Sequence, residues 1–239
     1  MSLRIQLEPA FVLSRRPYRE TSLLLEVFTR SHGRVGLVAR GAQSAKSKLR
    51  GVLEPLRPLL LSWNERGDLG TLTAAEASEI HWSPLAGEAV YCGWYLNELL
   101  LRLITRHDAH PALFADYADA LAQLATTPHE PALRVFEKRL LSELGYGLLL
   151  PDDLDPGLQY RYDWDEGPQP VAADTPRSYR GASLLALTHE QLLTPEHWRE
   201  ARRLLREALA RHGAGADLET PKLMRALRAS RNPAEVAHV

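Results

Sequence analysis

Cysteine and long apolar runs are nearly missing from this sequence. Cys92 is the single cysteine among 239 residues, which excludes an intrachain disulfide and a zinc site built from several thiolates and fits a reducing compartment. Asn97, Glu98 and Arg102 interrupt the longest apolar stretch, and the first residues lack the basic-then-apolar plan of a secretion signal. We therefore expect a cytoplasmic protein without a membrane partner.

The motifs of common catalytic sites are also missing. The sequence has no phosphate-binding glycine loop, nucleophile elbow or His-Glu-x-x-His, and His107 with His110 is the only close pair among nine histidines. Asp152, Asp153 and Asp155 raise the alternative of a magnesium-dependent nuclease. They share one proline-bounded loop without a second carboxylate set on a rigid element, so a solvated loop is favoured. We predict a protein that is not an enzyme and uses no metal or cofactor.

Acidic residues are missing from residues 30–51, which read RSHGRVGLVARGAQSAKSKLRG. Residues 1–50 hold ten Lys and Arg against three Glu, a net charge of +7, although the whole chain has a net charge of −1. Cations without nearby carboxylates can bind phosphates, so this stretch predicts a DNA contact. The candidate DNA-binding residues in it are Arg34, Arg40, Lys46, Lys48 and Arg50.

A second group of candidates precedes this stretch and consists of Arg15, Arg16, Tyr18 and Arg19. We expect the group in the loop between the first two strands, where the tyrosine could stack on a base while the arginines hold the backbone. The alternative is a solvated barrel rim that is charged for solubility. Phe28 and Trp63 are weaker stacking candidates, because aromatic residues in strands are more often core.

Alternating apolar residues and turn signals predict five short strands in the first 80 residues. The strands are expected at residues 10–14, 21–29, 35–40, 56–63 and 68–73. Pro17 is expected to break the first strand, because proline cannot donate to a strand ladder. Five strands with a longer third connection predict an OB-type barrel over residues 1–82, although the pattern alone also allows an SH3-like barrel.

From Ser83 onward the apolar period changes to about 3.6, which predicts a helical domain over residues 83–239 and an α+β fold for the whole chain. Ser83 is expected to cap the first helix, whereas Pro111 and Pro131 are expected to start the next two. Gly145 should end the third helix. An acidic excursion with a short hairpin follows at 151–181. The later helices are expected at residues 188–193, 194–212 and within 222–229, with Gly213 ending the second of these.

Two of these helices carry cations that we single out. On the helix at 194–212, an arginine row follows the spacing i, i+3, i+4, i+7 opposite an apolar face, and it is either a second DNA contact or a solvated face. Its members are Arg199, Arg202, Arg203 and Arg206. On the third helix, Arg134 and Lys138 lie one turn apart beside apolar residues, which suits an acidic peptide with an aromatic end. An ordinary amphipathic helix is the favoured interpretation of that pattern alone.

Three segments of the chain form a recognisable set. They are AFVLSRRPYRETSLLLEVFTRSHGRVGLVARGAQSAKSKLRGVLEPLRPLLLSW, YLNELLLRL and ALRVFEKRLLSELGYG. Together they resemble the bacterial RecO family of recombination and repair proteins over nearly all of residues 8–150. The resemblance implies an OB domain, a helical C-terminal domain, binding of single- and double-stranded DNA, and annealing of complementary strands. It also implies docking on the C-terminal tail of the single-strand-binding protein SSB and cooperation with RecR in loading RecA.

The resemblance also implies roles for particular residues. The DNA-facing role falls on Arg34, Arg40, Lys46, Lys48 and Arg50. The tail-docking role falls on Arg134 with Lys138 as support. Many relatives carry a four-cysteine zinc finger where this chain has residues 148–155, so the chain resembles the zinc-free branch. A late Lys-Ser-Arg motif of relatives is missing at residues 217–222. We expect a nucleoid-associated protein that is monomeric on its own.

Overall fold

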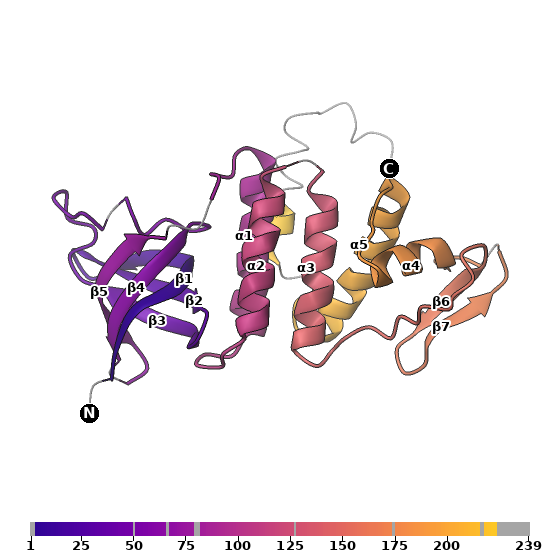
Figure 1. The fold of residues 1–239 in the computed structure, drawn as a ribbon, viewed down its shortest axis with the longest axis horizontal. Coiled ribbons are helices and arrows are strands. Elements are labelled where there is room, and N and C mark those ends of the chain that lie inside the picture. Colours follow the sequence, from indigo (N-terminus) through magenta and orange to yellow (C-terminus); the bar gives the residue numbers. More distant parts are fainter. Residues whose placement is uncertain are drawn as a thin grey trace. The chain divides into compact units, whose positions relative to one another are not determined.

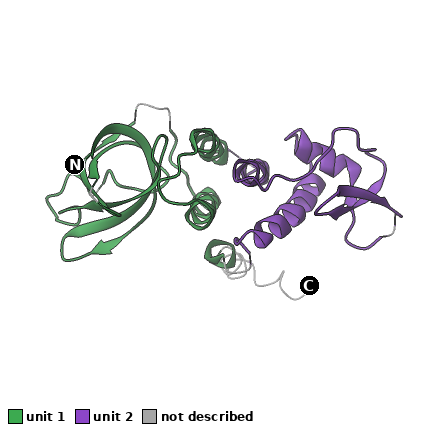
Figure 2. Ribbon diagram, turned by 90° about the horizontal axis from the view of Figure 1, so that it is seen from below, with its two compact units in different colours: residues 1–125, 217–239 green, residues 126–216 purple. Residues whose placement is uncertain are grey.

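The computed structural model describes residues 3–49, 51–65, 67–78, 82–126, 128–173, 175–215 and 218–223. The chain divides into two compact units, shown in Figure 2: unit 1 comprises residues 1–125 and 217–239, and unit 2 comprises residues 126–216. The first two helices therefore belong to the same compact unit as the strands. The division into compact units does not test the domain boundary that we expect at residue 82, so that boundary stays a prediction.

Unit 1 begins with a closed five-stranded barrel (Figure 1). Its strands are β1 (Leu3–Tyr18), β2 (Ser22–Thr29), β3 (Gly33–Ala39), β4 (Pro58–Glu65) and β5 (Gly70–Ala77). They close in the order β1-β2-β3-β5-β4, in which β3 and β5 are parallel and the other pairs are antiparallel. This five-strand Greek-key order confirms the OB-type barrel and excludes the SH3-like alternative.

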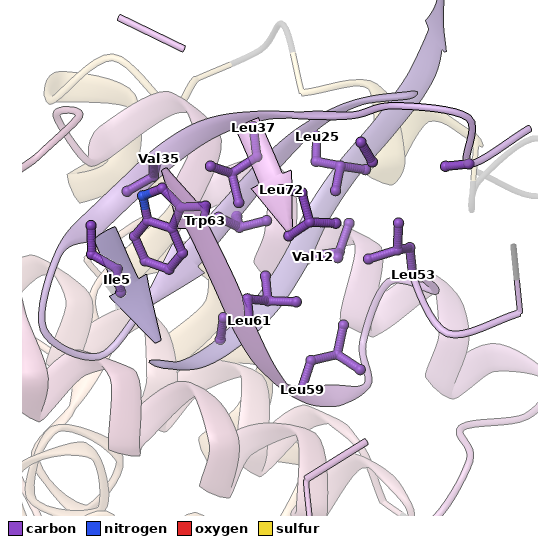
Figure 3. Close-up of a cluster of buried hydrophobic side chains, with 14 residues drawn as sticks. Ile5, Val12, Leu25, Val35, Leu37, Leu53, Leu59, Leu61, Trp63 and Leu72 are labelled. Carbon is purple, nitrogen blue, oxygen red and sulfur yellow. The ribbon is translucent and has the colours of Figure 1, made fainter. Parts of the chain in front are cut away.

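Alternate residues of the strands fill the barrel (Figure 3). Val12, Leu25, Leu37 and Leu61 point inward, as the period of two along a strand requires. Trp63 lies among them with 1% of its surface exposed. Trp63 is therefore a core residue, which is the interpretation that the sequence favoured over a stacking role.

β1 is longer than the sequence predicted. It continues through Arg15 and Arg16, and Pro17 pairs with Leu23 of β2. Beyond Phe11, β1 pairs with β2 but no longer with β4, so one of its edges is open there. Proline is tolerated at an open edge, because its missing N–H interrupts no ladder hydrogen bond. The expected break, and with it the placement of the two arginines in a loop, is wrong.

Unit 1 also contains two helices, α1 (Glu88–Leu103) and α2 (Pro111–Leu124). α2 starts at Pro111 as predicted, but α1 starts later than the expected cap at Ser83. Gly87 has a φ of +58° and directly precedes α1. A backbone in this left-handed region cannot continue a right-handed helix, so the turn at Gly87 sets the start.

Unit 2 combines helices with a small sheet. Its elements are α3 (Glu130–Glu143), β6 (Gln159–Asp163), β7 (Gly167–Val171), β8 (Tyr179–Arg180), α4 (Gly181–Thr188) and α5 (Pro195–Arg211). β6 and β7 form the expected hairpin, and β8 adds a third strand that the sequence did not predict. The capping glycines Gly145 and Gly213 both have positive φ and end α3 and α5 as predicted.

The helix expected at residues 188–193 is wrong, since α4 occupies residues 181–188 instead. Glu190 has a φ of +58°, and the backbone N–H of Gln191 returns to the carbonyl of Ala186. This is a left-handed cap made without glycine, so the apolar pattern did not reveal it.

In the part of the chain that the structure describes, no helix combines the length and apolar character needed to span a membrane. Residues 219–223 are helical. The first two residues of the short helix expected within 222–229 therefore lie in a helix. The rest of that segment lies outside the described residues.

Candidate nucleic-acid interface

The outer face of β1 and β2, which in OB barrels adjoins the usual oligonucleotide face, is covered by helices of the same unit. Phe11 and Phe28 contact Phe114 and Tyr117 of α2, with ring centroids 5.0–6.2 Å apart. Phe28 has 0% of its surface exposed. Phe28 is therefore a core residue, which is the interpretation that the sequence favoured, and a nucleic-acid strand could reach this face only by displacing α2.

A chain of polar groups fastens the same face to both helices. The hydroxyl of Tyr117 donates to the side-chain carbonyl of Asn97 on α1, and the Asn97 amide donates to the Leu13 carbonyl on β1 at 2.9 Å. Burial raises the pKa of Tyr117 well above its ordinary value. Buried polar groups that satisfy one another in this way fix one packing arrangement.

Arg34 on β3 takes part in this internal attachment. Its guanidinium donates to the Leu101 carbonyl of α1 and lies 3.9 Å from the carboxylate of Glu26, which also pairs with Arg106. Burial lowers the pKa of Arg34, the charge of Glu26 opposes that effect and the charge of Arg106 adds to it. The Arg34 side chain is therefore held by contacts within unit 1 and does not belong to the exposed cations of the barrel.

The other cations predicted on the barrel gather where β1 ends and β3 ends. We name this set the basic barrel end, and it comprises Arg16, Arg19, Arg40, Lys46 and Lys48, all of which are exposed. The backbone N–H of Gln43 donates to the Thr21 carbonyl at 2.8 Å, and the Gln43 amide donates to the Ser22 carbonyl. These bonds hold the loop after β3 against the β1–β2 turn, so the two groups of cations share one end of the barrel.

The remaining candidates at this end differ in how they are engaged. Arg15 forms an ion pair of 2.7 Å with Glu54 and donates to the Leu53 carbonyl, which ties the loop before β4 to β1. Arg19 lies 5.2 Å from the ring centroid of Tyr18, and Tyr18 is half-buried. Arg50 lies outside the described residues. Sequence reasoning missed Glu54, because an ion pair between distant segments leaves no local pattern.

In unit 2, the predicted peptide-binding residue Arg134 is buried, with 4% of its surface exposed. Its guanidinium pairs with Glu137 at 2.7 Å and lies 3.7 Å from Glu130, which is 3.6 Å from Arg202 of α5. Glu137 has 1% of its surface exposed. The sequence identified the arginine but not this buried carboxylate partner.

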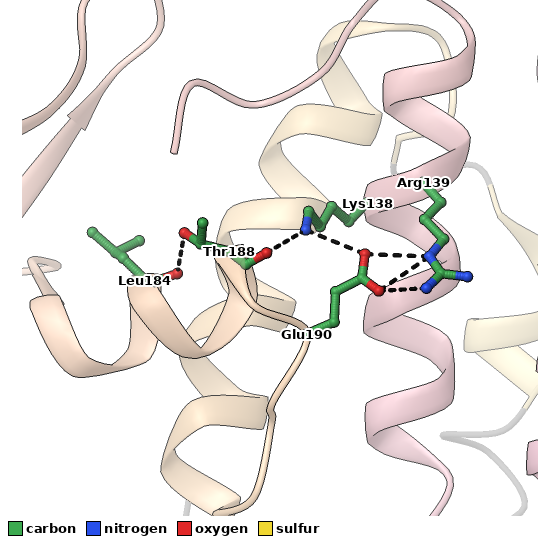
Figure 4. A network of polar contacts seen from close by, with 5 residues as sticks. All are labelled: Lys138, Arg139, Leu184, Thr188 and Glu190. Carbon is green, nitrogen blue, oxygen red and sulfur yellow. Dashed lines mark hydrogen bonds and ion pairs between the residues drawn. The ribbon is translucent and has the colours of Figure 1, made fainter. Parts of the chain in front are cut away.

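Lys138 is also engaged, as Figure 4 shows. Its ammonium donates to the Thr188 carbonyl at 2.7 Å and to Glu190 at 3.2 Å, and Arg139 pairs with the same carboxylate. Burial alone would raise the pKa of Glu190, but the hydrogen bond from Arg139 and the charge and hydrogen bond of Lys138 outweigh it and lower the pKa. These contacts clamp the end of α4 to α3.

The arginine row on α5 lies along one side of a pocket of about 470 Å³ within unit 2. We name it the arginine pocket, and its charged lining residues are Arg177, Arg199, Arg202, Arg203, Arg206 and Glu207. Ala201, Leu205 and Ala208 are buried on the other side of α5, as predicted. Arg177 comes from the loop before β8, and the helical spacing could not indicate that it joins the row.

Two carboxylates of the acidic loop have close neighbours within unit 2. Asp155 caps the backbone N–H of Gly157 at 2.8 Å, and Asp152 lies 3.9 Å from His189. Among the described residues, no group of three or more His, Cys, Asp or Glu side chains is placed to hold a metal ion.

Comparison with known proteins places nearly the whole chain in one family. Residues 1–81 match the family model described as Recombination protein O N terminal, and residues 85–220 match the one described as Recombination protein O C terminal. The DNA repair protein RecO of Dechloromonas aromatica is 43% identical over 95% of this chain and 99% of its own length. The one of Alkalilimnicola ehrlichii is 45% identical over 94% of this chain and 92% of its own length. The chain therefore belongs to the RecO family of DNA repair proteins.

Proposed function

We propose that the protein is a recombination mediator that binds single- and double-stranded DNA and anneals complementary strands coated by SSB. In this proposal it docks on the SSB C-terminal tail and helps RecR to load RecA. The observation that carries the DNA role is the basic barrel end. Its five cations are exposed, and none of them forms an ion pair with a residue that the structure describes.

The mechanism proposed for annealing is electrostatic and involves no covalent step. Docking on the SSB tail raises the local concentration of the protein at coated strands. The cations of the basic barrel end then replace counterions on the phosphates, which lowers the repulsion between two backbones. Complementary bases can meet once that repulsion falls, so the protein accelerates annealing by proximity.

The DNA role is tested by Lys46→Ala with Lys48→Ala. Removing two phosphate contacts should lower the slope of log affinity against log salt by about 1.4 for a single strand, measured by fluorescence anisotropy of a labelled oligonucleotide. The matched control is Arg4→Ala with Arg30→Ala, which removes the same charge from exposed residues at the opposite end of the barrel. An unchanged slope in the lysine variant, or an equal loss in the control, contradicts the assignment.

The tail-docking role is proposed for Arg134, with Lys138 holding α3 to α4. Removing Arg134 alone would break its buried ion pair with Glu137, and breaking a buried pair by removing one member typically costs about 3–5 kcal/mol. The sharper variant is Arg134→Gln with Glu137→Gln, which removes both charges and keeps hydrogen-bonding side chains. We expect it to lose binding of an SSB-tail peptide in a fluorescence titration while strand affinity and Tm stay unchanged. Retained peptide binding contradicts the role.

The covered outer face of β1 and β2 favours a second candidate, an OB-fold adaptor that binds proteins but does not anneal DNA. Annealing of SSB-coated complementary oligonucleotides separates the two functions. The mediator should accelerate annealing in proportion to its concentration and more weakly at high salt. An adaptor should leave the annealing rate unchanged and show no salt-dependent oligonucleotide binding.

A further inference from the structure

The arginine pocket of unit 2 has the size and charge of an anion site. Its volume of about 470 Å³ lies within the range of ligand pockets. Five arginines and one glutamate line it, which corresponds to a formal charge of +4. Among the described residues, its uncharged lining residues are Ala210 and Gly215. The pocket therefore offers guanidinium groups to phosphates but no aromatic ring on which a base could stack.

The arginines of the pocket differ in how far they are neutralised. Arg177 pairs with Glu207 at 3.2 Å in an exposed pair of the kind that contributes little stability. Arg202 lies 3.6 Å from the half-buried Glu130. Arg199 makes one long contact, of 3.4 Å, to the Pro195 carbonyl. Within the described ranges, Arg206 has no ion pair or hydrogen bond. Two exposed guanidinium groups thus remain available to an incoming anion.

Arg203 holds the two walls of the pocket together. Its guanidinium donates to the Ser178 carbonyl and lies 4.2 Å from the ring centroid of Tyr179 on β8. A cation over an aromatic face in a partly buried setting stabilises its own position. Arg203 therefore positions the segment that carries Arg177 against α5 before any ligand arrives, which lowers the ordering cost of binding.

The length of the arginine row indicates which class of anion the arginine pocket fits. Arg199 and Arg206 are seven residues apart on α5, a rise of about 10 Å along the helix axis. A nucleic-acid strand carries one phosphate for each nucleotide, so a row of this length can contact more than one phosphate of the same strand. A mononucleotide or inorganic phosphate would occupy only part of it.

We propose that the arginine pocket binds the phosphodiester backbone of a nucleic-acid strand, and that it does so independently of the basic barrel end. One molecule then holds two strands, one on each compact unit. The proposal deepens the proposed annealing function and relies on it for the first strand. Backbone contacts without base readout suit this task, because annealing must proceed on any sequence.

The test is co-capture of two strands that cannot pair. Full-length protein is bound to a biotinylated oligo-dT on beads, and a fluorescent oligo-dT is added. The wild type should retain the second strand with one protein molecule per pair of strands, as light scattering of the free complex would report. Arg199→Ala with Arg206→Ala should keep the first strand but lose co-capture by at least roughly tenfold, since two charge-assisted contacts are removed. Unchanged co-capture, or co-capture by a protein dimer with one strand per copy, overturns the proposal.

The matched control is Arg161→Ala with Arg180→Ala, which removes the same charge from exposed residues of unit 2 outside the pocket. Its co-capture should equal that of the wild type, and an equal loss would overturn the pocket assignment. Unlabelled oligo-dT and a nucleoside triphosphate are then compared as competitors at equal phosphate concentration. Equal displacement of the second strand by both would also overturn the proposal.

The two proposals fail separately. If only the Lys46→Ala, Lys48→Ala variant keeps the wild-type salt slope, the barrel assignment fails and the pocket stands. If only the Arg199→Ala, Arg206→Ala variant keeps both slope and co-capture, the pocket fails and the barrel stands.

Discussion

Gly33 is a residue whose backbone conformation and packing both require that it has no side chain. Its φ is +64°, and a Cβ atom built on it would lie 2.0 Å from the carbonyl oxygen of Asp108 in the loop between α1 and α2. The neighbouring backbone N–H of His107 donates to the Arg34 carbonyl at 3.0 Å. The helical loop can approach the start of β3 this closely because residue 33 is a glycine.

We predict that Gly33→Ala destabilises the protein by roughly 2 kcal/mol or more, because it combines left-handed backbone strain with a backbone clash. Urea unfolding followed by circular dichroism measures the change. Gly51→Ala is the matched control, since Gly51 has no positive φ and its Cβ would meet no atom within 4 Å. The control should stay within roughly 0.5 kcal/mol of the wild type. Equal stability of both variants would contradict the close approach.

At the scale of elements, the clamp between α3 and α4 depends on the charge of one carboxylate. Glu190 ends α4 in a left-handed conformation and receives Lys138 and Arg139 from α3. Its pKa is lowered from the ordinary value of 4.5 because these hydrogen bonds and charges outweigh the effect of burial. A group with a depressed pKa in the folded state stabilises the fold above its unfolded pKa, and that contribution disappears as the pH falls through the folded pKa.

We predict that Glu190→Gln lowers the free energy of unfolding by roughly 1–2 kcal/mol at pH 7, and that the difference from the wild type shrinks towards zero below pH 4.5. Urea unfolding at a series of pH values measures it. Glu166→Gln, at an exposed position on the β6–β7 turn, is the control and should show no such pH-dependent difference. A difference that persists unchanged in acid would show that the ion pairs are not its source.

At the scale of the molecule, the barrel and the first two helices form one unit because the outer face of β1 and β2 is apolar. Phe11 and Phe28 are buried there against Phe114 and Tyr117. Removing the helices would expose a contiguous apolar patch, and such patches promote association. We therefore expect the barrel to need α1 and α2 in order to stay folded as a monomer.

We predict that a fragment of residues 1–82 self-associates and binds an apolar fluorescent dye, whereas a fragment of residues 1–125 stays monomeric and unfolds cooperatively. Sedimentation velocity and dye fluorescence distinguish the outcomes. A monomeric 1–82 fragment without dye binding would show that the barrel is complete without its helices and would support the domain boundary expected at residue 82.

The candidate interface could be predicted from sequence only in part. Lys46 and Lys48 could be predicted as unneutralised cations, because the stretch around them has no acidic residue, and both are exposed. Arg34 belongs to the same stretch, yet it is held by Glu26 and by the Leu101 carbonyl, which lies 67 positions away. Charge patterning measures local composition, whereas engagement of a side chain depends on which distant segments pack beside it.

The sequence by itself determined what depends on near neighbours in the chain: the alternation of the strands, the proline start of α2, the glycine ends of α3 and α5, and the arginine row on α5. These features follow from residues a few positions apart, so local physics is enough. Only the tertiary structure decided that helices cover the outer face of β1 and β2, that Arg134 is buried with Glu137, and that Arg177 joins the arginine row. A side chain on the surface of a helix or strand is buried, paired or left exposed according to which other segment packs against it. The fold as a whole determines that segment.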